Sequence, residues 1–344
     1  AYINGPQVKD FASHLSRYLD VDHVIPCANG TDALQIALMA LELEPGDEVI
    51  TPDFTFISTV EVVSLLGLKP VLVDVDPDYF TLSVDDVKSK LTEKTRAIVP
   101  VHLYGQCAPV GESMQLADEH GLKVIEDVAQ ALGADYLEGN SNRKAGTISD
   151  IGCTSFFPSK NLGCYGDGGA LFTNDPSLAD KIQTIANHGS HQKYYHSRIG
   201  VNSRLDTLQA AILNVKLKYL NRYNQARQKA AAFYDQELAG ISQVQIPKKY
   251  GQSTHIYHQY TLVLNEDVSR DDLKKYLTDK QMPSMVYYPV PMHLQEAFNE
   301  GQYAKGDFPV SERLSRSVIS LPMHTEIDRE QLEYISETFK QYFL

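Results

Sequence analysis

One lysine stands at the end of a short apolar run and directly before a turn rich in glycine. Lys160 closes the segment Ser155-Phe156-Phe157-Pro158-Ser159-Lys160, and Gly163, Gly166, Gly168 and Gly169 follow it. An amine held among apolar groups is poorly solvated as a cation, so its pKa falls and its neutral form can attack an aldehyde. The Ser155 hydroxyl and the backbone N–H groups of the turn could bind a phosphate. A small molecule with both groups is pyridoxal 5′-phosphate (PLP); the alternative is an ordinary solvated lysine.

Three further segments hold residue types that such a ligand needs. Asn29-Gly30-Thr31-Asp32 begins a predicted helix, and backbone N–H groups at a helix start bind phosphate. Asp127 follows a predicted strand, where a carboxylate could keep the pyridine nitrogen protonated while Gln130 reaches the phenolic oxygen. Phe56, also just after a strand, could stack on the flat ring. The alternatives are helix capping at the first two places and burial in the core for Phe56.

Size and composition narrow the classes of function. The chain has 344 residues, of which 43% are hydrophobic and 22% charged, and its net charge is −13. That charge argues against a nucleic acid or a polybasic membrane contact, and no apolar run reaches the roughly 18–20 residues of a membrane span. Cys27, Cys107, Cys153 and Cys164 form no C-x-x-C pair, and we recognise no signal peptide. We therefore expect a cytoplasmic protein with free buried thiols and no metal site.

The predicted elements suggest how these residues could meet. Segments rich in apolar and β-branched residues at 48–51, 70–75, 97–101, 123–126, 154–157 and 169–173 read as strands, and helical periodicities separate the first four of them. Such alternation is typical of a parallel sheet covered by helices, whose ligands bind at the carboxyl ends of the strands. After a long helical stretch at 204–238 we expect strands at 258–264 and 284–288 and helices at 269–280 and 328–343. We predict an α/β domain over 1–220 and an α+β domain over 221–344, divided within the long helical stretch.

Taken together, these segments resemble the DegT-type family of nucleotide-sugar aminotransferases, which are fold-type-I PLP enzymes. The resemblance extends over essentially the whole chain and rests on residues 27–34, 45–50, 126–130, 155–160 and 200–204. It implies an α/β fold in which a mainly parallel seven-stranded sheet lies between helices, followed by a smaller C-terminal α+β domain.

The resemblance also assigns roles within the cofactor site. In the family, the residue that matches Lys160 holds PLP covalently and the one that matches Asp127 pairs with the pyridine nitrogen. Residues that match Gly30, Thr31 and Ser155 hold the phosphate, and those that match Phe56 and Gln130 flank the ring. The match of Asn202 reaches the phosphate from the neighbouring subunit, which implies a homodimer with shared active sites.

For the substrate, the chain is most similar to enzymes that aminate UDP-linked 2-acetamido-3-keto-hexuronic acids for bacterial surface polysaccharides such as lipopolysaccharide, with glutamate as the expected donor. Lys193, Arg198 and Arg204 are candidates for binding the carboxylates and the diphosphate, or else ordinary surface charges. Tyr287-Tyr288-Pro289 stands where His-Tyr-Pro is common, and His293 matches the family pattern. We expect Tyr287, Tyr288 and His293 to contact the substrate.

Three other functions stay open from the sequence. The enzyme could aminate a 4-keto sugar, or it could be a PLP-dependent sugar dehydratase of the same fold. The dehydratases carry histidine where this chain has Lys160, which argues against that function. A non-enzymatic regulatory protein could also have kept the scaffold.

Overall fold

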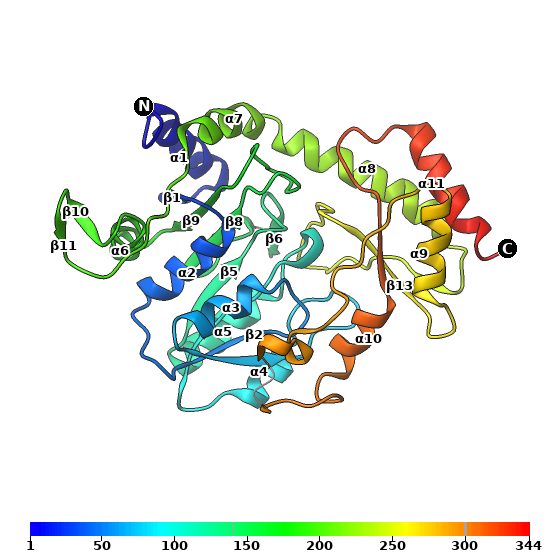
Figure 1. The fold of residues 1–344 in the computed structure, drawn as a ribbon, viewed down its shortest axis with the longest axis horizontal. Coiled ribbons are helices and arrows are strands. Elements are labelled where there is room, and N and C mark those ends of the chain that lie inside the picture. The colour runs from blue at the N-terminus through cyan, green and yellow to red at the C-terminus, as the bar shows by residue number, and fades with distance from the viewer. Residues whose placement is uncertain (140, 299–300) are drawn as a thin grey trace.

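The computed structural model describes residues 1–139, 141–298 and 301–344. A seven-stranded sheet forms the centre of the larger part, in the order β1-β9-β8-β5-β4-β2-β3 (Figure 1). Only β9 runs against its neighbours β1 and β8, and the remaining neighbours in the sheet are parallel. The strands are β1 (His23–Cys27), β2 (Glu48–Pro52), β3 (Lys69–Val73), β4 (Thr95–Ile98), β5 (Lys123–Asp127), β8 (Ile151–Ser155) and β9 (Gly169–Thr173). The expected mainly parallel seven-stranded sheet is confirmed.

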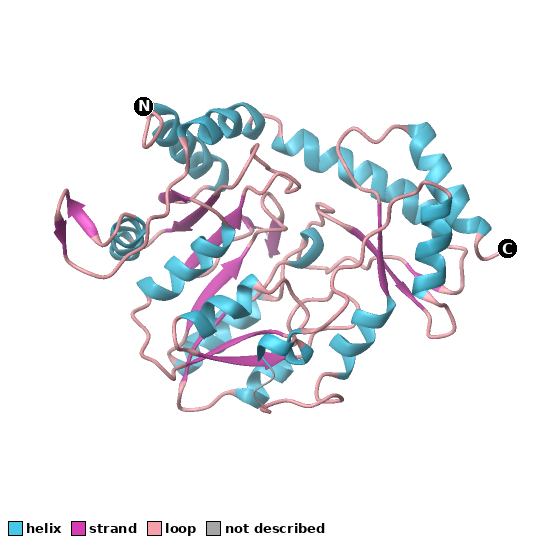
Figure 2. Ribbon diagram, in the orientation of Figure 1, coloured by secondary structure: helices cyan, strands magenta, loops and turns pink. Residues whose placement is uncertain are grey.

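Helices cover both faces of this sheet (Figure 2). They are α1 (Pro6–Leu19), α2 (Gly30–Ala40), α3 (Ser58–Leu65), α4 (Val84–Lys90), α5 (Val110–His120), α6 (Pro176–Ala186) and α7 (Thr207–Leu217). Consecutive strand residues point to opposite faces: Val49 packs with α2, α3 and α6, whereas Ile50 packs with α4 and α5. All five residues of β2 and of β9 are buried for this reason, which explains why apolar residues stand next to one another in Val49-Ile50 and Ala170-Leu171-Phe172.

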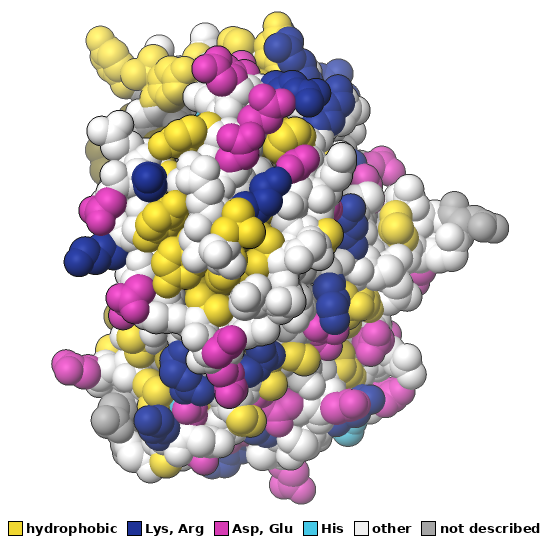
Figure 3. All heavy atoms as spheres, turned by 90° about the vertical axis from the view of Figure 1, so that its right-hand side faces the viewer, with side chains coloured by type: hydrophobic (Ala, Val, Ile, Leu, Met, Phe, Trp, Pro, Cys, Tyr) yellow, Lys and Arg dark blue, Asp and Glu magenta, His cyan; other side chains and the backbone are white. Residues whose placement is uncertain are grey.

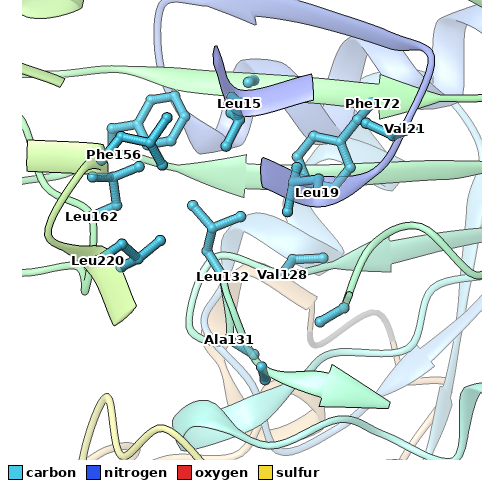
Figure 4. Close-up of a cluster of buried hydrophobic side chains, with 14 of the residues drawn as sticks. Leu15, Leu19, Val21, Val128, Ala131, Leu132, Phe156, Leu162, Phe172 and Leu220 are labelled. Atoms are coloured by element: carbon cyan, nitrogen blue, oxygen red, sulfur yellow. The ribbon is translucent and has the colours of Figure 1, made fainter. Parts of the chain in front are cut away.

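A second apolar cluster supports the segment that carries Lys160. Leu15 and Leu19 of α1 pack in the same cluster as Phe156 and Leu162, which lie on either side of the lysine along the chain (Figure 4). Phe156 also meets Phe11 edge to face, with 5.2 Å between the ring centroids. The lysine loop is therefore anchored at both ends in the core of the large sheet.

The long helical stretch predicted at 204–238 is two helices, because α7 ends at Leu217 and α8 (Leu220–Leu238) begins three residues later. Leu220 belongs to the core of the large sheet, whereas Tyr234 and Leu238 belong to a separate C-terminal core. The elements of this C-terminal part are β12 (Val244–Gln245), β13 (Tyr260–Leu264), α9 (Arg270–Asp279), α10 (Pro309–Ser317), β14 (Val318–Leu321) and α11 (Arg329–Gln341). The predicted domain boundary at residue 220 stays a prediction.

The strand predicted at 284–288 is wrong. Met285 forms one isolated bridge to Ser320, and the strands that pair with β13 are β12 and β14 instead. Pro283 and Pro289 enclose the segment and cannot donate ladder hydrogen bonds, while Tyr287 and Tyr288 line a cavity. The β-rich composition of this segment therefore reflects aromatic lining and not sheet pairing.

Short elements complete the chain. Two hairpins join β6 (Asp135–Glu138) to β7 (Ser141–Lys144) and β10 (Ser190–Gln192) to β11 (Tyr195–His196), and the second hairpin projects from the body of the molecule (Figure 1). The 3₁₀ turns are η1 (Leu103–Gly105), η2 (Met292–Leu294) and η3 (Glu296–Phe298). Within the described ranges no helix has both the length and the apolar character needed to cross a bilayer. On the face shown in Figure 3, basic and acidic side chains are interspersed, which does not suit a polyanion.

Candidate active site

A cavity of about 640 Å³ opens where the parallel strands end, a size that suits a small-molecule ligand. Its wall is formed largely by residues that follow β1, β2, β5 and β8. The cavity brings together nine of the residues predicted from the sequence: Gly30, Thr31, Phe56, Asp127, Gln130, Ser155, Lys160, Tyr287 and Tyr288.

One end of the cavity suits an oxyanion. The starts of α2 and α3 meet there, joined by a hydrogen bond of 2.8 Å between the hydroxyls of Thr31 and Ser58. A Cβ on Gly30 would lie 2.7 Å from the Cβ of Ser155, so only glycine lets the helix start approach that side chain. Backbone N–H groups and three hydroxyls thus surround one place, which is the donor set of a phosphate site. Asn29 caps α2 by accepting from the Asp32 N–H, so the capping alternative is right for that residue.

A buried carboxylate occupies another wall. Asp127 is the last residue of β5 and is 7% exposed. Its Oδ2 accepts a hydrogen bond from the Thr59 hydroxyl at 2.9 Å, and its Oδ1 accepts from the Ala129 N–H at 3.1 Å. A turn and not a helix follows, so the capping alternative for Asp127 is wrong. Held by two donors, the carboxylate can balance a cation inside the cavity.

Lys160 faces the same cavity. Burial lowers the pKa of its amine from 10.5 to about 8, while the charge of Asp127 opposes that shift. About one amine in ten is then neutral at pH 7, compared with fewer than one in a thousand for an ordinary lysine. The backbone N–H of Lys160 donates to the backbone carbonyl of Phe157 at 2.8 Å and so closes a tight turn. In that turn Gly163 lies so near that an added Cβ would be 2.5 Å from the Pro158 oxygen. The site therefore presents a nucleophilic amine from a fixed backbone.

Aromatic and amide groups form the rest of the wall. Gln130 is oriented by two hydrogen bonds, since its Oε1 accepts from the Tyr104 N–H at 2.9 Å and its Nε2 donates to the Tyr288 hydroxyl at 3.0 Å. Phe56 is 53% exposed, and its ring centroid lies 6.1 Å from that of Tyr288. The alternative of a core phenylalanine is therefore wrong. The exposed ring face can cover a flat ligand.

Other predicted residues lie outside this cavity. His293 is fully buried, with its Nδ1 2.8 Å from Asp53 Oδ2 and its Nε2 3.3 Å from Glu312 Oε1. The structure therefore places His293 in a framework between β2 and α10 and not in the cavity wall. Lys193 lies in the turn of the β10–β11 hairpin, Arg198 pairs with Glu42 at 3.3 Å, and neither lines the cavity of its own chain.

Asn202 and Arg204 also lie outside the cavity of their own chain, where Asn202 is exposed and bridges to Asn187. The substrate contacts predicted for Lys193, Arg198 and Arg204 stay predictions, and so does the reach of Asn202 into the site of a neighbouring subunit. Sequence reasoning missed Ser58, Thr59 and Tyr104, whose contacts with the predicted residues arise only in the fold.

Known proteins share the sequence pattern and the fold of this chain. The model of the DegT/DnrJ/EryC1/StrS aminotransferase family matches residues 1–340. The chain belongs to that family. The resemblance inferred from the motifs is thus confirmed, and this aminotransferase has the fold expected for it.

Several relatives match almost the whole aminotransferase. A protein from Geobacillus stearothermophilus described as a pleiotropic regulatory protein is 44% identical over 99% of this chain and 91% of its own length. UDP-2-acetamido-2-deoxy-3-oxo-D-glucuronate aminotransferase from Pseudomonas aeruginosa is 44% identical over 97% of this chain and 90% of its own. UDP-N-acetyl-3-dehydro-alpha-D-glucosamine 3-aminotransferase from Acidithiobacillus ferrooxidans is 43% identical over 99% and 90%.

Solved structures agree. DesV from S. venezuelae, in complex with a ketimine intermediate, superposes with a TM-score of 0.95 at 38% identity, covering 99% of this chain and 90% of DesV. NtdA from Bacillus subtilis, with its bound cofactor PMP, gives 0.92 at 32% identity, covering 99% of this chain and 78% of NtdA. PLP is the aldehyde form of that cofactor, and the cavity of this aminotransferase has groups that fit each part of it: an amine for the aldehyde, a carboxylate for the ring nitrogen, and a glycine-lined helix start for the phosphate.

Proposed function

We propose that this aminotransferase uses PLP to move the amino group of glutamate to a nucleotide-linked keto sugar. When bound, PLP supplies the aldehyde that carries the amino group and a ring that withdraws electrons. The observation that carries the proposal is the buried Lys160 amine, with its pKa near 8, in the same cavity as the Asp127 carboxylate.

The residues of the cavity divide the work. Lys160 binds the aldehyde, and its freed amine accepts a proton and returns it, which a pKa close to the working pH favours. Asp127, held by Thr59 and the Ala129 N–H, keeps a cationic ring nitrogen charged. The N–H groups at Gly30 and Thr31, with the Ser58 and Ser155 hydroxyls, hold the phosphate.

We infer that the sugar is a UDP-2-acetamido-3-keto-hexuronic acid that serves bacterial surface polysaccharide synthesis. The support is the 44% identity to the Pseudomonas enzyme, whose substrate is of that kind. The 43% identical Acidithiobacillus enzyme also acts on a UDP-linked 3-keto sugar, so it supports the same carbon.

We further propose a homodimer whose subunits complete each other's sites. Within the described lining, Lys160 is the one lysine or arginine, yet the cofactor phosphate, the glutamate carboxylates and a diphosphate all need positive partners. Lys193, Arg198, Asn202 and Arg204 lie outside the cavity of their own chain and could supply that of a second copy. Tyr165, Tyr194, Ile199 and Leu208 are each more than two-thirds exposed, which is unusual for large apolar side chains that stay in water.

Product analysis tests the reaction. The protein with PLP and glutamate is incubated with three nucleotide sugars: a UDP-3-keto-hexuronate, a UDP-3-keto sugar without the carboxylate, and a 4-keto sugar. We expect 2-oxoglutarate and an amino sugar, fastest with the first substrate, and no turnover by Lys160→Ala. A deoxy sugar without transferred nitrogen would indicate the dehydratase, and preference for the 4-keto sugar would overturn the assigned carbon. Mixed dimers of Lys160→Ala and Asn202→Ala subunits regain activity only if Asn202 acts across the interface.

A regulatory role is the second candidate, because the Geobacillus relative is described as a regulatory protein. The two roles predict different changes in visible absorbance when glutamate is added to the protein with PLP. A catalytic protein with PLP absorbs visible light and bleaches when glutamate is added, whereas a regulator without this chemistry does not respond. The intact set of Lys160, Asp127, Gln130 and Ser155 in the cavity favours catalysis.

A further inference from the structure

Tyr104 lies behind the cavity wall and bonds to that wall in three directions. It is 2% exposed and does not itself line the cavity. Its N–H donates to Gln130 Oε1 at 2.9 Å, its carbonyl accepts from the Gln259 N–H at 3.3 Å, and its hydroxyl donates to the Tyr287 carbonyl. All three partners line the cavity. Each polar group of Tyr104, in main chain and side chain, thus holds a residue that faces the ligand space.

The three partners of Tyr104 come from two parts of the chain. Gln130 follows β5 of the large sheet, whereas Gln259 and Tyr287 belong to the C-terminal part, on either side of β13. Gln130 extends the connection, because its Nε2 donates to the Tyr288 hydroxyl at 3.0 Å. Tyr104 therefore joins the wall built by the large sheet to the wall built by the C-terminal part, through bonds that span between 26 and 183 positions of sequence.

The backbone of Tyr104 adopts a conformation that few bulky residues adopt. Its φ is 57° and its ψ is 0°, in the left-handed region, where a side chain costs free energy unless the surroundings compensate. The compensation is visible here. The Tyr104 ring meets Phe80 edge to face with 5.3 Å between centroids, and a Cβ on the next residue, Gly105, would lie 2.8 Å from the backbone nitrogens of Tyr257 and His258. The turn after β4 is therefore pressed against the C-terminal part and holds Tyr104 in one orientation.

We propose that Tyr104 is a positioning residue for the sugar substrate. It fixes the Tyr287–Tyr288 stretch relative to Gln130 and thereby fixes the gap in which the sugar meets the cofactor. This inference rests on the proposed function, in which Asp127 and Gln130 face the ring and the two tyrosines contact the sugar. Without the hydroxyl of Tyr104, the Tyr287 carbonyl loses its donor and the stretch moves to find another. A keto sugar held by a displaced wall is then misaligned with the reacting atoms.

Tyr104→Phe tests the hydroxyl alone, because it keeps the ring against Phe80 and both main-chain bonds to Gln130 and Gln259. In a reaction of two half-reactions, each kcat/KM reports on the step of its own substrate. We expect kcat/KM for the keto sugar to fall about tenfold, because its alignment is lost, while kcat/KM for glutamate and the affinity for PLP stay within about twofold. An equal fall for both substrates would indicate general distortion and overturn the inference.

Tyr234→Phe is the matched control. Tyr234 is fully buried in the C-terminal core, and its hydroxyl also donates to a backbone carbonyl, that of Pro322, at 2.9 Å. Neither residue lines the cavity, so this variant loses a comparable bond without releasing the wall. Both values of kcat/KM should stay unchanged. An unchanged kcat/KM for the sugar in Tyr104→Phe, or the same fall in both variants, would contradict the role of Tyr104.

A second readout does not depend on turnover. In protein made with tyrosine that carries ¹³C at the carbonyl and ¹⁵N at the amide, carbonyl–amide NMR signals arise only where two tyrosines are adjacent, at Tyr194-Tyr195 and Tyr287-Tyr288. Tyr287→Phe removes the second signal and so assigns it, and the first is the internal reference. Loss of its donor should move the Tyr287 carbonyl signal upfield in Tyr104→Phe and not in Tyr234→Phe. A signal that stays in place in Tyr104→Phe would sink the proposal.

Amide hydrogen exchange of the wild-type protein covers the case in which Tyr104→Phe does not fold. The N–H groups of Tyr104 and Gln259 are both donors in the proposed connection and should exchange slowly. Fast exchange of either would refute the inference. A protein in which both amides are protected and the Tyr287 signal moves as expected, but which makes no amino sugar, would support the placement of the wall by Tyr104 and refute the proposed function.

Discussion

Replacing Lys160 by methionine should stabilise the protein when PLP has been removed. The difference between a pKa of 10.5 in the unfolded chain and about 8 in the native cavity corresponds to about 3 kcal/mol by which burial disfavours the ammonium. Below pH 8 both states are protonated, so the native state carries this cost in full. Methionine has a similar length and no charge, and we therefore expect it to remove the cost.

The sign of the pH dependence follows from linkage. Between pH 8 and 10.5 the unfolded state binds more protons at Lys160 than the native state does, so the stability of the wild-type protein rises with pH in that window. The advantage of Lys160→Met should therefore be largest below pH 8 and disappear near pH 10.5.

Thermal unfolding of the PLP-free proteins measures the effect. With an unfolding entropy of about 2.1 cal/mol/K per residue, 3 kcal/mol corresponds to a rise in Tm of about 4 °C for a chain of this length. Lys274→Met, at an exposed position on α9, is the control and should leave Tm unchanged. If Lys160→Met lowers Tm at pH 7, or raises it equally at every pH, the amine is not held in a desolvated state and the reasoning fails.

Three more substitutions test the surroundings of the cofactor. Thr59→Val removes the hydroxyl that donates to Asp127, so the affinity for PLP, measured by equilibrium dialysis, should fall by about 1.5–3 kcal/mol. Thr59→Ser keeps a hydroxyl at this position and should keep the affinity. Gly30→Ala places a Cβ 2.7 Å from that of Ser155 and should weaken PLP binding, while Gly240→Ala, with open space around it, should not; equal affinities would disprove the close approach. Glu126→Gln disrupts a buried carboxylate that accepts from His102 and from the N–H groups of Gly146, Ile148 and Ser149, and Tm should fall by about 4–7 °C at pH 7. Burial raises the pKa of Glu126, but its donors lower it below 4.5 overall, so this difference in Tm should shrink as the pH falls through that lower value.

Most strands of the large sheet could be predicted because the residue pattern within each strand already indicates that both of its faces are buried. Strands covered on both faces, such as β2 and β9, have adjacent apolar residues that point to opposite faces, as in Val49-Ile50 and Ala170-Leu171-Phe172, and this pattern needs no knowledge of distant residues. β1 was not predicted: it is an edge strand that contains Pro26, which such a strand tolerates. β14 has four residues, too short for a periodic signal, and its pairing with β13 bridges 54 residues or more of intervening chain.

Site residues that belong to a short continuous motif could be predicted from the sequence. Site residues whose role depends on a contact with a residue far away in the sequence could not. Lys160, Asp127 and Gly30 stand in short segments whose residue types suggest the chemistry. Thr59 belongs to an apolar helix and meets Asp127 across 68 positions, and Tyr104 meets Tyr287 across 183, so neither contact has a local signal. The lowered pKa of Lys160 likewise arises from the packed cavity, which the sequence does not describe.

The framework around His293 has a consequence for changing this enzyme by design. The buried contacts of His293 with Asp53 and Glu312 join the end of β2 to α10. The Tyr287–Tyr288 stretch lies a few residues before His293 in the chain. The two tyrosines line the cavity, whereas the three framework side chains do not. Position 287 can therefore be varied, as a test of its predicted contact with the substrate, without replacing any of the three framework side chains. Position 288 is less free, because the Tyr288 hydroxyl also orients Gln130.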